Sequence, residues 1–277
     1  AMLVDVDGQQ WAAAVEPVRL EGWQRSLHAD YTTTRAYEAL VKAALLLANQ
    51  RHVDRLVTGL PVNQARDSDR REALRRLLAG RHPTPLGDIE VREIRIVPQP
   101  VGAYVDLLWS DVDDETLERI ESGTVLVLDV GHYSFDWAVV VAGELRRGAS
   151  GTSLEAMSVL LEKAAAQIAQ EYGGRPQPLA LEAALRQGRS HLLVPGSRVP
   201  LRPVVEPAAR EISGLALEAL RQSLRREMTN VDLVLLTGGG GELYGQKAAD
   251  LFPGADVRLA PEPVIANARG FFRYGRR

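Results

Sequence analysis

The sequence predicts an α/β protein built from two similar halves, with a ligand held between them. Two glycine-rich turns, each directly after an apolar strand, are the first reason: residues 125–136 read VLVLDVGHYSFD and residues 231–242 read VDLVLLTGGGGE. The second reason is the order of elements, since each half runs through strands, helix, strand, helix, strand and helix. Two such turns in one chain favour a ligand that is gripped from both sides.

The first half opens with a hairpin, because apolar residues alternate over 3–6 and 10–15 around the turn-forming pair Asp7-Gly8. Residues 69–79 are predicted to form a helix capped by Asp69, with Glu72 completing a capping box. Residue spacing predicts the other elements, which are, in order, a helix over 34–50, strands at 55–58 and 89–97, a helix over 101–110 and a short helix ending near residue 121.

The second half restarts the pattern after Gly123. A long helix is predicted to begin at Thr152, with Glu155 as its capping partner. The other predicted elements are strands at 125–130, 135–141 and 144–149, a short helix at 179–187, a hairpin around Gly196, a helix over 206–228, and then a strand, the glycine turn, a helix, a strand and a terminal helix.

Composition places the chain among ordinary globular proteins. Its 277 residues are 45% hydrophobic and 25% charged, which allows about two domains of usual size. The net charge of −3 creates no overall field that favours DNA or an anionic membrane. The absence of cysteine excludes disulfides, thiolate metal sites and a cysteine nucleophile, and it fits a reducing interior.

Neither a membrane span nor a secretion signal is visible. Uninterrupted apolar runs such as residues 43–48 are far too short to cross a bilayer. The N-terminus has no basic stretch followed by an apolar one. We therefore expect a cytoplasmic protein.

The small residues of the two turns favour contact with an anion or a sugar, because backbone N–H groups can approach without a Cβ in the way. Asp129 ends the first strand and Asp136 follows seven residues later, so a metal-phosphate group could be held between carboxylate and backbone. The second turn opens onto a helix whose N-terminal dipole would face the ligand. It is not a P-loop, since Gln246 stands where that motif requires lysine.

Five segments resemble, in the same order, motifs of the actin-like ATPases, and within them the bacterial plasmid-segregation group of ParM and StbA. They are VTGLPV at 57–62, VPQPVGAY at 97–104, residues 126–136, residues 235–242 and PVIANARG at 263–270. The resemblance covers nearly the whole chain. It implies a duplicated actin-like, ribonuclease-H-like fold around Mg-ATP, with one domain at 1–122, lacking its opening β-hairpin, and the other at 123–277.

The resemblance assigns catalytic roles to Asp129, whose counterpart organises Mg²⁺ through water, and to Gln99, which falls where relatives place a Gln or Glu that positions the attacking water. Other matching residues are predicted to bind the nucleotide. They are Gly131, His132, Tyr133 and Ser134 in the phosphate motif, and Gly238, Gly239 and Gly240 in the adenosine motif. Relatives usually have Gly-Gly-Thr where this chain has the bulkier residues 132–134, so the loop is expected to sit differently on the phosphates.

The first phosphate motif of the family, Asp-x-Gly followed by a small residue and Lys or Gln, lacks a good match. Residues 3–10 (LVDVDGQQ) are superficially similar, but Trp11 and three alanines follow, and no lysine occurs before Lys42. These residues fit better as a later strand pair. We expect the first β-hairpin, whose place would be before residue 1, to be missing, and ATPase activity to require it.

Three functions are compatible with these patterns. The resemblance implies an ATPase that forms nucleotide-dependent filaments for plasmid segregation, with ATP or ADP, copies of itself and a DNA-bound adaptor as partners. The alternative is a non-catalytic actin-fold binding or regulatory protein that has lost the first phosphate loop. A sugar or acid kinase of the same superfamily is more distant, because no acceptor-substrate loop is found.

Each site residue also has a purely structural explanation. Asp129 could be an ordinary turn residue, Gln99 a packed loop residue between two prolines, and His132 a solvated loop histidine. The other histidines show no metal-ligand spacing. The basic run Arg70, Arg71, Arg75 and Arg76 could contact DNA or a neighbouring subunit, or could simply be a solvated helix face.

Overall fold

The computed structural model of the chain describes residues 2–16, 19–20, 28–227 and 230–276. The chain divides into two compact units, Ala1–Val97 with Phe271–Arg277, and Pro98–Gly270. The domain boundary between residues 122 and 123 was predicted from the internal repeat, which is a different criterion, and it stays a prediction.

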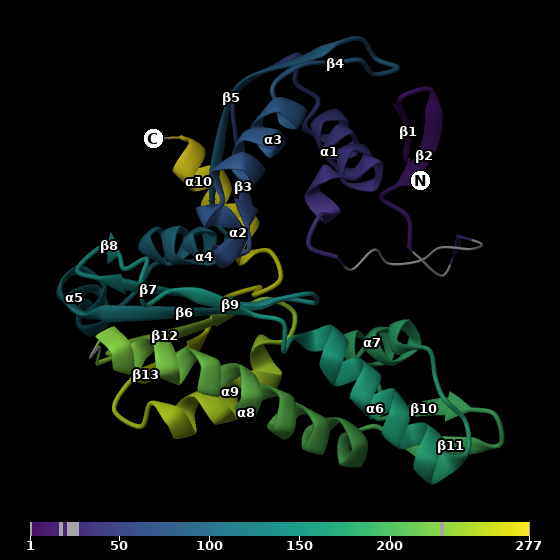
Figure 1. The fold of residues 1–277 in the computed structure, drawn as a ribbon, viewed down its shortest axis with the longest axis vertical. Coiled ribbons are helices and arrows are strands. Elements are labelled where there is room, and N and C mark those ends of the chain that lie inside the picture. Colours follow the sequence, from purple (N-terminus) through teal and green to yellow (C-terminus); the bar gives the residue numbers. More distant parts are fainter. Residues whose placement is uncertain (1, 17–18, 21–27, 228–229, 277) are drawn as a thin grey trace. The chain divides into compact units, whose positions relative to one another are not determined.

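The smaller unit contains a three-stranded sheet in the order β3-β5-β4 (Figure 1). Its elements are β1 (Met2–Val6), β2 (Gln9–Ala13), the 3-10 helix η2 (Tyr31–Thr33), α1 (Arg35–Ala48), β3 (His52–Leu60), α2 (Val62–Arg66), α3 (Ser68–Leu78), β4 (Gly80–His82) and β5 (Ile89–Pro98). The predicted hairpin is confirmed as the antiparallel pair β1-β2. It turns at Asp7 and Gly8, both at positive φ, and it forms a separate two-stranded sheet.

Side chains cap two helices of this unit, and the one cap that was predicted here needs correction. Thr34 caps α1, because its side chain accepts a hydrogen bond from the Tyr37 N–H. Asp69 was wrongly predicted to cap α3. The cap is Asp67, whose carboxylate accepts hydrogen bonds from the N–H groups of Asp69 and Arg70. The helix starts one residue earlier than the capping-box pattern suggests, so Asp69 lies in the first turn.

The larger unit is built on a six-stranded sheet in the order β13-β12-β6-β7-β8, with β9 paired to β7. Its elements are α4 (Gln99–Leu108), α5 (Asp114–Ser122), β6 (Thr124–Val130), β7 (Phe135–Val141), β8 (Glu144–Leu145), β9 (Gly151–Ser153), α6 (Met157–Tyr172), α7 (Pro178–Arg186), β10 (His191–Val194), β11 (Ser197–Pro200), α8 (Arg202–Glu227), β12 (Leu233–Thr237), α9 (Gly241–Leu251) and β13 (Asp256–Leu259). Helix α10 (Ala266–Gly275) begins in this unit, and its residues from Phe271 onward belong to the smaller one. Strand β12 is parallel to β6 and β13, and β7 is antiparallel to β6.

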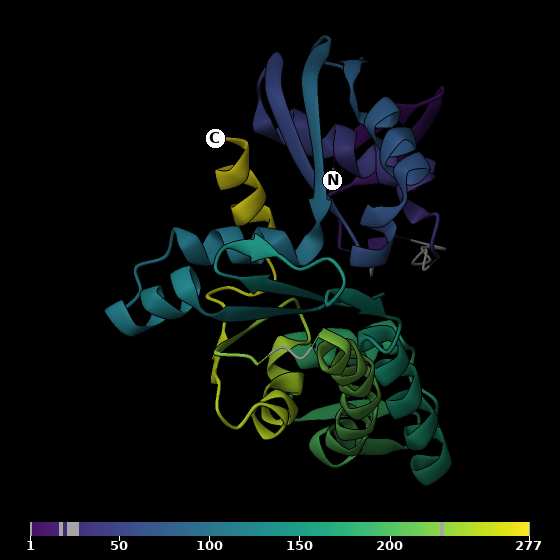
Figure 2. The ribbon, with the colours of Figure 1, turned by 60° about the vertical axis from the view of Figure 1, so that its left-hand side comes forward.

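Helices cover both faces of this sheet (Figures 1 and 2). Leu126 and Leu128 of β6 belong to the core shared with α6, α8 and α9. Val125 and Val127 point the other way, into the core shared with α4 and α5. A central strand buried on both faces reads as a continuous apolar run, which is why β6 could be found in the sequence.

Three local predictions are corrected and one is confirmed. The helix predicted from Thr152 begins at Met157, because residues 151–153 pair with β7 as an edge strand instead. The strand predicted over 144–149 is reduced to β8. Gln99 does not lie in a loop but opens α4, where Pro100 suits the first helical turn. The hairpin around Gly196 is confirmed as β10-β11.

Candidate functional site

The two glycine turns lie at the same edge of the larger sheet. Strands β6 and β12 are parallel neighbours, and Asp129 at the end of β6 is paired with Thr237 at the end of β12. The turn at residues 131–134 therefore starts beside the turn at residues 238–240. The carboxyl ends of parallel strands are where open α/β sheets bind their ligands.

Asp129 is a buried carboxyl group, only 6% exposed. Burial is the main reason why its pKa is raised to about 7, and the negative charge of Asp136 raises the pKa further. A hydrogen bond donated by Asn267 Nδ2 to Asp129 Oδ2, 2.7 Å long, opposes the rise. A carboxyl group balanced in this way near neutral pH is typical of functional sites.

Asp136 is the second buried carboxylate, directly opposite Asp129 in the β6-β7 pair. It accepts hydrogen bonds from Ser134 Oγ and Thr152 Oγ1, each 2.5 Å long. Ser134, predicted to contact phosphate, therefore directs its hydroxyl to Asp136. The hydroxyl supports the second carboxylate of the hairpin, and the predicted contact of Ser134 with a phosphate stays a prediction.

Glycine is required at two positions of the second turn. Gly238 has φ +79°, and a Cβ there would lie 2.5 Å from the Val130 carbonyl oxygen and 2.7 Å from Asp129 Oδ1. A Cβ on Gly240 would lie 2.6 Å from Val130 Cγ1 and from Met157 Sδ. Gly239 differs, since a Cβ there would meet nothing within 4 Å. The outer glycines thus pack the turn against Asp129 and its neighbours, and the middle one faces open space.

Backbone hydrogen bonds fix both turns. The Gly238 N–H donates to the Pro263 carbonyl, and the Gly240 N–H donates to the Val130 carbonyl. In the first turn the Gly131 N–H donates to the Ser134 carbonyl. In the part of the chain that the structure describes, no acceptor is recorded for the N–H groups of Tyr133, Ser134 or Gly239. Donors of this kind at a fixed turn are the groups that bind anions.

The side chain of His132 lies next to α7. Its Nδ1 lies 3.7 Å from Glu182 Oε2 on α7, and both side chains are about one-quarter exposed. The carbonyl of His132 also accepts a hydrogen bond from the Ser158 N–H, which ties the turn to the start of α6. The neighbouring Tyr133 is half-buried. The predicted contacts of His132 and Tyr133 with a phosphate stay predictions.

Asn267 was missed as a site residue, although the PVIANARG segment that contains it was recognised. Its amide joins Asp129 to α4, because Oδ1 accepts the Ala103 N–H at 3.0 Å while Nδ2 binds the carboxylate. Gln99 is half-buried and lies one helical turn before Ala103, so both occupy the same side of α4. No single signal in the sequence distinguishes this asparagine from a surface residue.

A Mg²⁺ ion bound with a nucleotide is compatible with these residues. Among the described residues, no three His, Cys, Asp or Glu side chains are grouped to hold a metal ion by themselves. Mg²⁺, however, needs only one or two carboxylates when phosphates and water complete its shell. Asp129, buried beside two turns with backbone donors, offers such a carboxylate.

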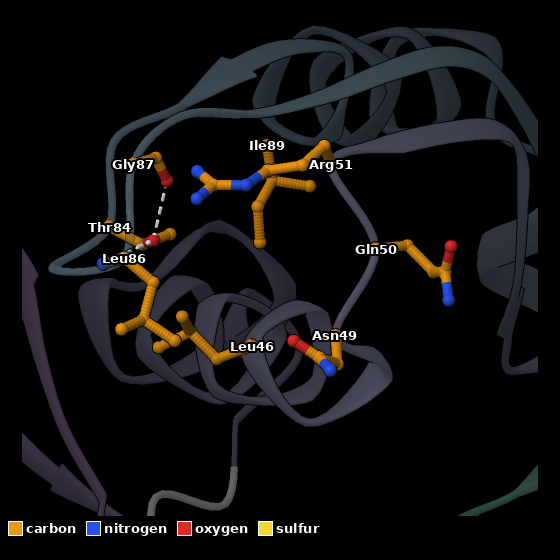
Figure 3. Close-up of a pocket in the computed structure, with 8 residues that line it drawn as sticks. All are labelled: Leu46, Asn49, Gln50, Arg51, Thr84, Leu86, Gly87 and Ile89. Carbon is orange, nitrogen blue, oxygen red and sulfur yellow. Dashed lines mark hydrogen bonds between the residues drawn. The ribbon is translucent and has the colours of Figure 1, made fainter.

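A hollow of about 190 Å³ lies in the smaller unit (Figure 3). Leu46, Leu86 and Ile89 form its apolar walls, and the guanidinium of Arg51 points towards Gly87. Its lining contains no carboxylate and none of the residues predicted to bind a nucleotide.

No helix among the described residues is long and apolar enough to span a membrane.

Two family models match the chain. The model for the N-terminal domain of actin-like proteins matches residues 1–102, and the model for the C-terminal region of MreB-like archaeal actin homologues matches residues 127–250. An archaeal actin homolog of Thermoplasma volcanium is 28% identical over 194 residues, which cover 66% of this chain and 56% of the relative. The matched region therefore spans little more than half the length of that relative.

Solved structures confirm the predicted fold class. The crystal structure of an archaeal actin homolog in complex with ADP has a TM-score of 0.72 at 22% identity, covering 88% of this chain and 78% of that one. A ParM filament from Clostridium botulinum has a TM-score of 0.69 at 18% identity, covering 90% of this chain and 75% of that one.

Proposed function

Because the chain belongs to the actin-like protein family, we propose that it binds an adenine nucleotide with Mg²⁺ at the edge of its larger sheet, hydrolyses ATP and assembles into nucleotide-dependent filaments. One observation carries the proposal. The buried carboxyl of Asp129 lies between two turns whose glycines bring the backbone close to it. This arrangement matches the needs of a phosphate chain, which requires backbone donors and a neighbouring carboxylate for its metal ion.

The two turns would bind different parts of the nucleotide. The N–H groups of Tyr133 and Ser134 are available to phosphate oxygens, and the open space over Gly239 is available to the ribose and base. The rigid contacts of Gly238 and Gly240 with Val130 hold the second turn in register with the first. A site that is fixed before the ligand arrives loses less entropy on binding.

Bound Mg²⁺ would neutralise charge on the phosphates and polarise the bond to be broken. Asp129 would hold it through water, and a nearby cation favours the ionised form of a carboxyl group whose pKa is raised to about 7. Gln99 would orient the attacking water through its side-chain carbonyl, because an amide is too weak a base to remove a proton.

The ParM filament among the similar structures and the ParM-like sequence segments support self-assembly. We further propose that the filaments act in plasmid DNA segregation, through a DNA-bound adaptor protein. With a net charge of −3, the chain has no general attraction to DNA, which is consistent with contact through an adaptor.

The test is calorimetric titration of the full-length protein with ATP, with and without Mg²⁺, combined with phosphate release and light scattering. We expect Mg²⁺-dependent binding, slow turnover, and scattering that rises with ATP. Mg²⁺-dependent binding without turnover would instead favour a non-catalytic actin-fold binding or regulatory protein. An absence of any nucleotide binding would contradict the proposal.

A further inference from the structure

The side-chain amide of Asn267 contacts Asp129, which is expected to organise the metal ion, and the backbone of α4, the helix that begins at Gln99. Its Nδ2 donates to Asp129 Oδ2 at 2.7 Å, and its Oδ1 accepts the backbone N–H of Ala103 at 3.0 Å. The contact with Ala103 fixes the orientation of the amide, because a backbone N–H can only donate and must therefore meet Oδ1, which leaves Nδ2 for Asp129. The amide is therefore held from both ends.

The contact with Asp129 distinguishes the two oxygens of the carboxylate. Oδ2 is occupied by Asn267, whereas Oδ1 lies over the glycine turn, 2.7 Å from where a Cβ of Gly238 would stand. Without the amide, the carboxylate could rotate about its Cβ–Cγ bond. The hydrogen bond therefore keeps Oδ1 directed towards the turn where the ligand is proposed to bind.

The contact between Asn267 Oδ1 and the Ala103 N–H lies one helical turn after Gln99, the first residue of α4. In an α-helix the N–H of residue 103 points along the axis towards the carbonyl of residue 99. The Oδ1 atom that shares this N–H consequently lies beside the first turn of α4. One amide thus connects the carboxylate expected to organise the metal ion with the helix start that carries the expected water-positioning side chain.

A second link joins the same two segments without approaching Asp129. The guanidinium of Arg269 binds the buried carboxylate of Asp106 on α4, with Nη2 to Oδ2 at 2.7 Å. The backbone of Gly270 also packs directly on Gly102, where any side chain would collide. The attachment of the 266–270 segment to α4 therefore does not depend on Asn267 alone.

We propose that Asn267 is a positioning residue, which sets the direction of the Asp129 carboxylate and couples it to the start of α4. The inference rests on the proposed function. Its role is analogous to that of the partners that orient metal ligands in other sites, where removal costs about 10-fold to 100-fold in metal affinity or activity.

The test compares the full-length protein with its Asn267→Ala variant. We expect the Mg²⁺ concentration for half-maximal ATP turnover to rise about 10-fold or more. Affinity for ATP in EDTA should stay within about threefold, because the backbone donors are unchanged. If Asn267→Ala does not fold, Asn267→Ser, whose side chain is too short to reach both partners, is measured in the same way.

The matched control is the double variant Asp106→Asn/Arg269→Gln, which removes the other link without leaving an unpaired buried charge. It should keep the Mg²⁺ requirement of the unmodified protein. If both variants shift this requirement equally, or neither does, Asn267 only packs the segment and the inference is wrong. If the unmodified protein binds no Mg-nucleotide at all, the proposed function itself fails, which is a separate result.

Coupling to α4 is measured with a double-mutant cycle. Asn267→Ala and Gln99→Ala should be non-additive in the turnover rate at saturating Mg²⁺, because each removes part of one arrangement. Additive effects would overturn the link to α4.

Discussion

Two hairpins of this chain carry an aspartate at the end of their first strand, shortly before a glycine, yet the two aspartates have different surroundings. Asp5 in β1-β2 is exposed, and its Oδ1 accepts the N–H of Gly8 at 3.0 Å, so it stabilises its own turn. Asp129 in β6-β7 is only 6% exposed, and its partner Asn267 lies 138 positions along the chain.

The difference follows from the sheet to which each hairpin belongs. β1-β2 is a two-stranded sheet of its own. β6-β7 lies inside the larger sheet, where β12 on the other side of β6 brings its glycine turn against Asp129. A local pattern of aspartate and glycine therefore specifies a turn, and tertiary neighbours make one of the two carboxylates a candidate for chemistry.

The largest expected effect is a difference in ATP turnover between alanine variants of the two aspartates, Asp129 and Asp5. Asp129→Ala should lower the ATP turnover of the full-length protein at least about 100-fold, because the carboxylate expected to organise Mg²⁺ is lost. Asp5→Ala should stay within about twofold, since its side-chain contacts, with Gly8 and Gln10, are confined to its own hairpin. Phosphate release measures both, with circular dichroism as the check on folding. Equal loss of structure and turnover in Asp129→Ala would make this residue a structural one.

The second prediction compares two glycines with nearly the same backbone conformation. Gly8 has φ +77° and free space around it, whereas Gly238 has φ +79° and stands against Val130 and Asp129. Gly8→Ala should lower the free energy of unfolding by about 1 kcal/mol. Gly238→Ala should lower it by about 3 kcal/mol, because steric overlap is added to the backbone strain. Urea unfolding of both variants is the measurement. Equal losses would mean that the neighbours of Gly238 move aside easily.

The third prediction concerns pH, in the absence of nucleotide and metal. The pKa of Asp129 is raised from 3.8 to about 7 in the folded chain, so the folded form binds more protons than the unfolded form in that interval. The contribution of this group to stability is therefore complete below the unfolded pKa and is lost as the pH rises through the folded one.

Asp129→Asn keeps a neutral side chain at every pH, and it should remove this dependence. Its free energy of unfolding relative to the unmodified protein should increase by roughly 1 kcal/mol per pH unit between the two pKa values, and level off above them. Chemical unfolding over this pH range measures the difference. A constant difference between the two proteins would show that Asp129 is ionised throughout.

Much of the fold could be predicted because its signals lie in neighbouring residues. The buried strand β6, both glycine turns and the hairpin at Asp7-Gly8 are recognisable from runs of apolar residues and from turn chemistry. The predicted cap at Thr152 failed for the opposite reason. Pairing with β7, a contact made across the fold, outweighed a good local helix signal.

The candidate site could be predicted only as far as its motifs extend. The bridging role of Asn267 depends on a contact with Ala103, 164 positions away. The orientation of His132 depends on Glu182, on a helix that follows much later. Neither Ala103 nor Glu182 lies at a fixed spacing from its partner in the sequence, so no local pattern predicts these two contacts. The roles assigned to the site residues remain predictions.

The smallest expected effect tests whether the neighbourhood of Asp129 includes Gln99. Gln99 opens α4, on the side that Asn267 ties to Asp129. Gln99→Ala should slow hydrolysis by up to about tenfold and leave ATP affinity almost unchanged, because the residue is expected to orient water and not to hold the nucleotide. Filaments, where they form, should then persist longer.

The Gln99→Glu variant is compared with Gln99→Ala, because a glutamate carboxylate oxygen can accept a hydrogen bond from water at nearly the same position as the glutamine oxygen. It should keep much of the turnover, as relatives with glutamate at this position imply. Single-turnover hydrolysis and calorimetry on both variants separate rate from affinity. If Gln99→Ala weakens ATP binding as much as it slows turnover, the Gln99 side chain is a packing residue at the start of α4, between Pro98 and Pro100. ATP hydrolysis at this edge of the larger sheet would then depend on Asp129 and the two glycine turns, without Gln99.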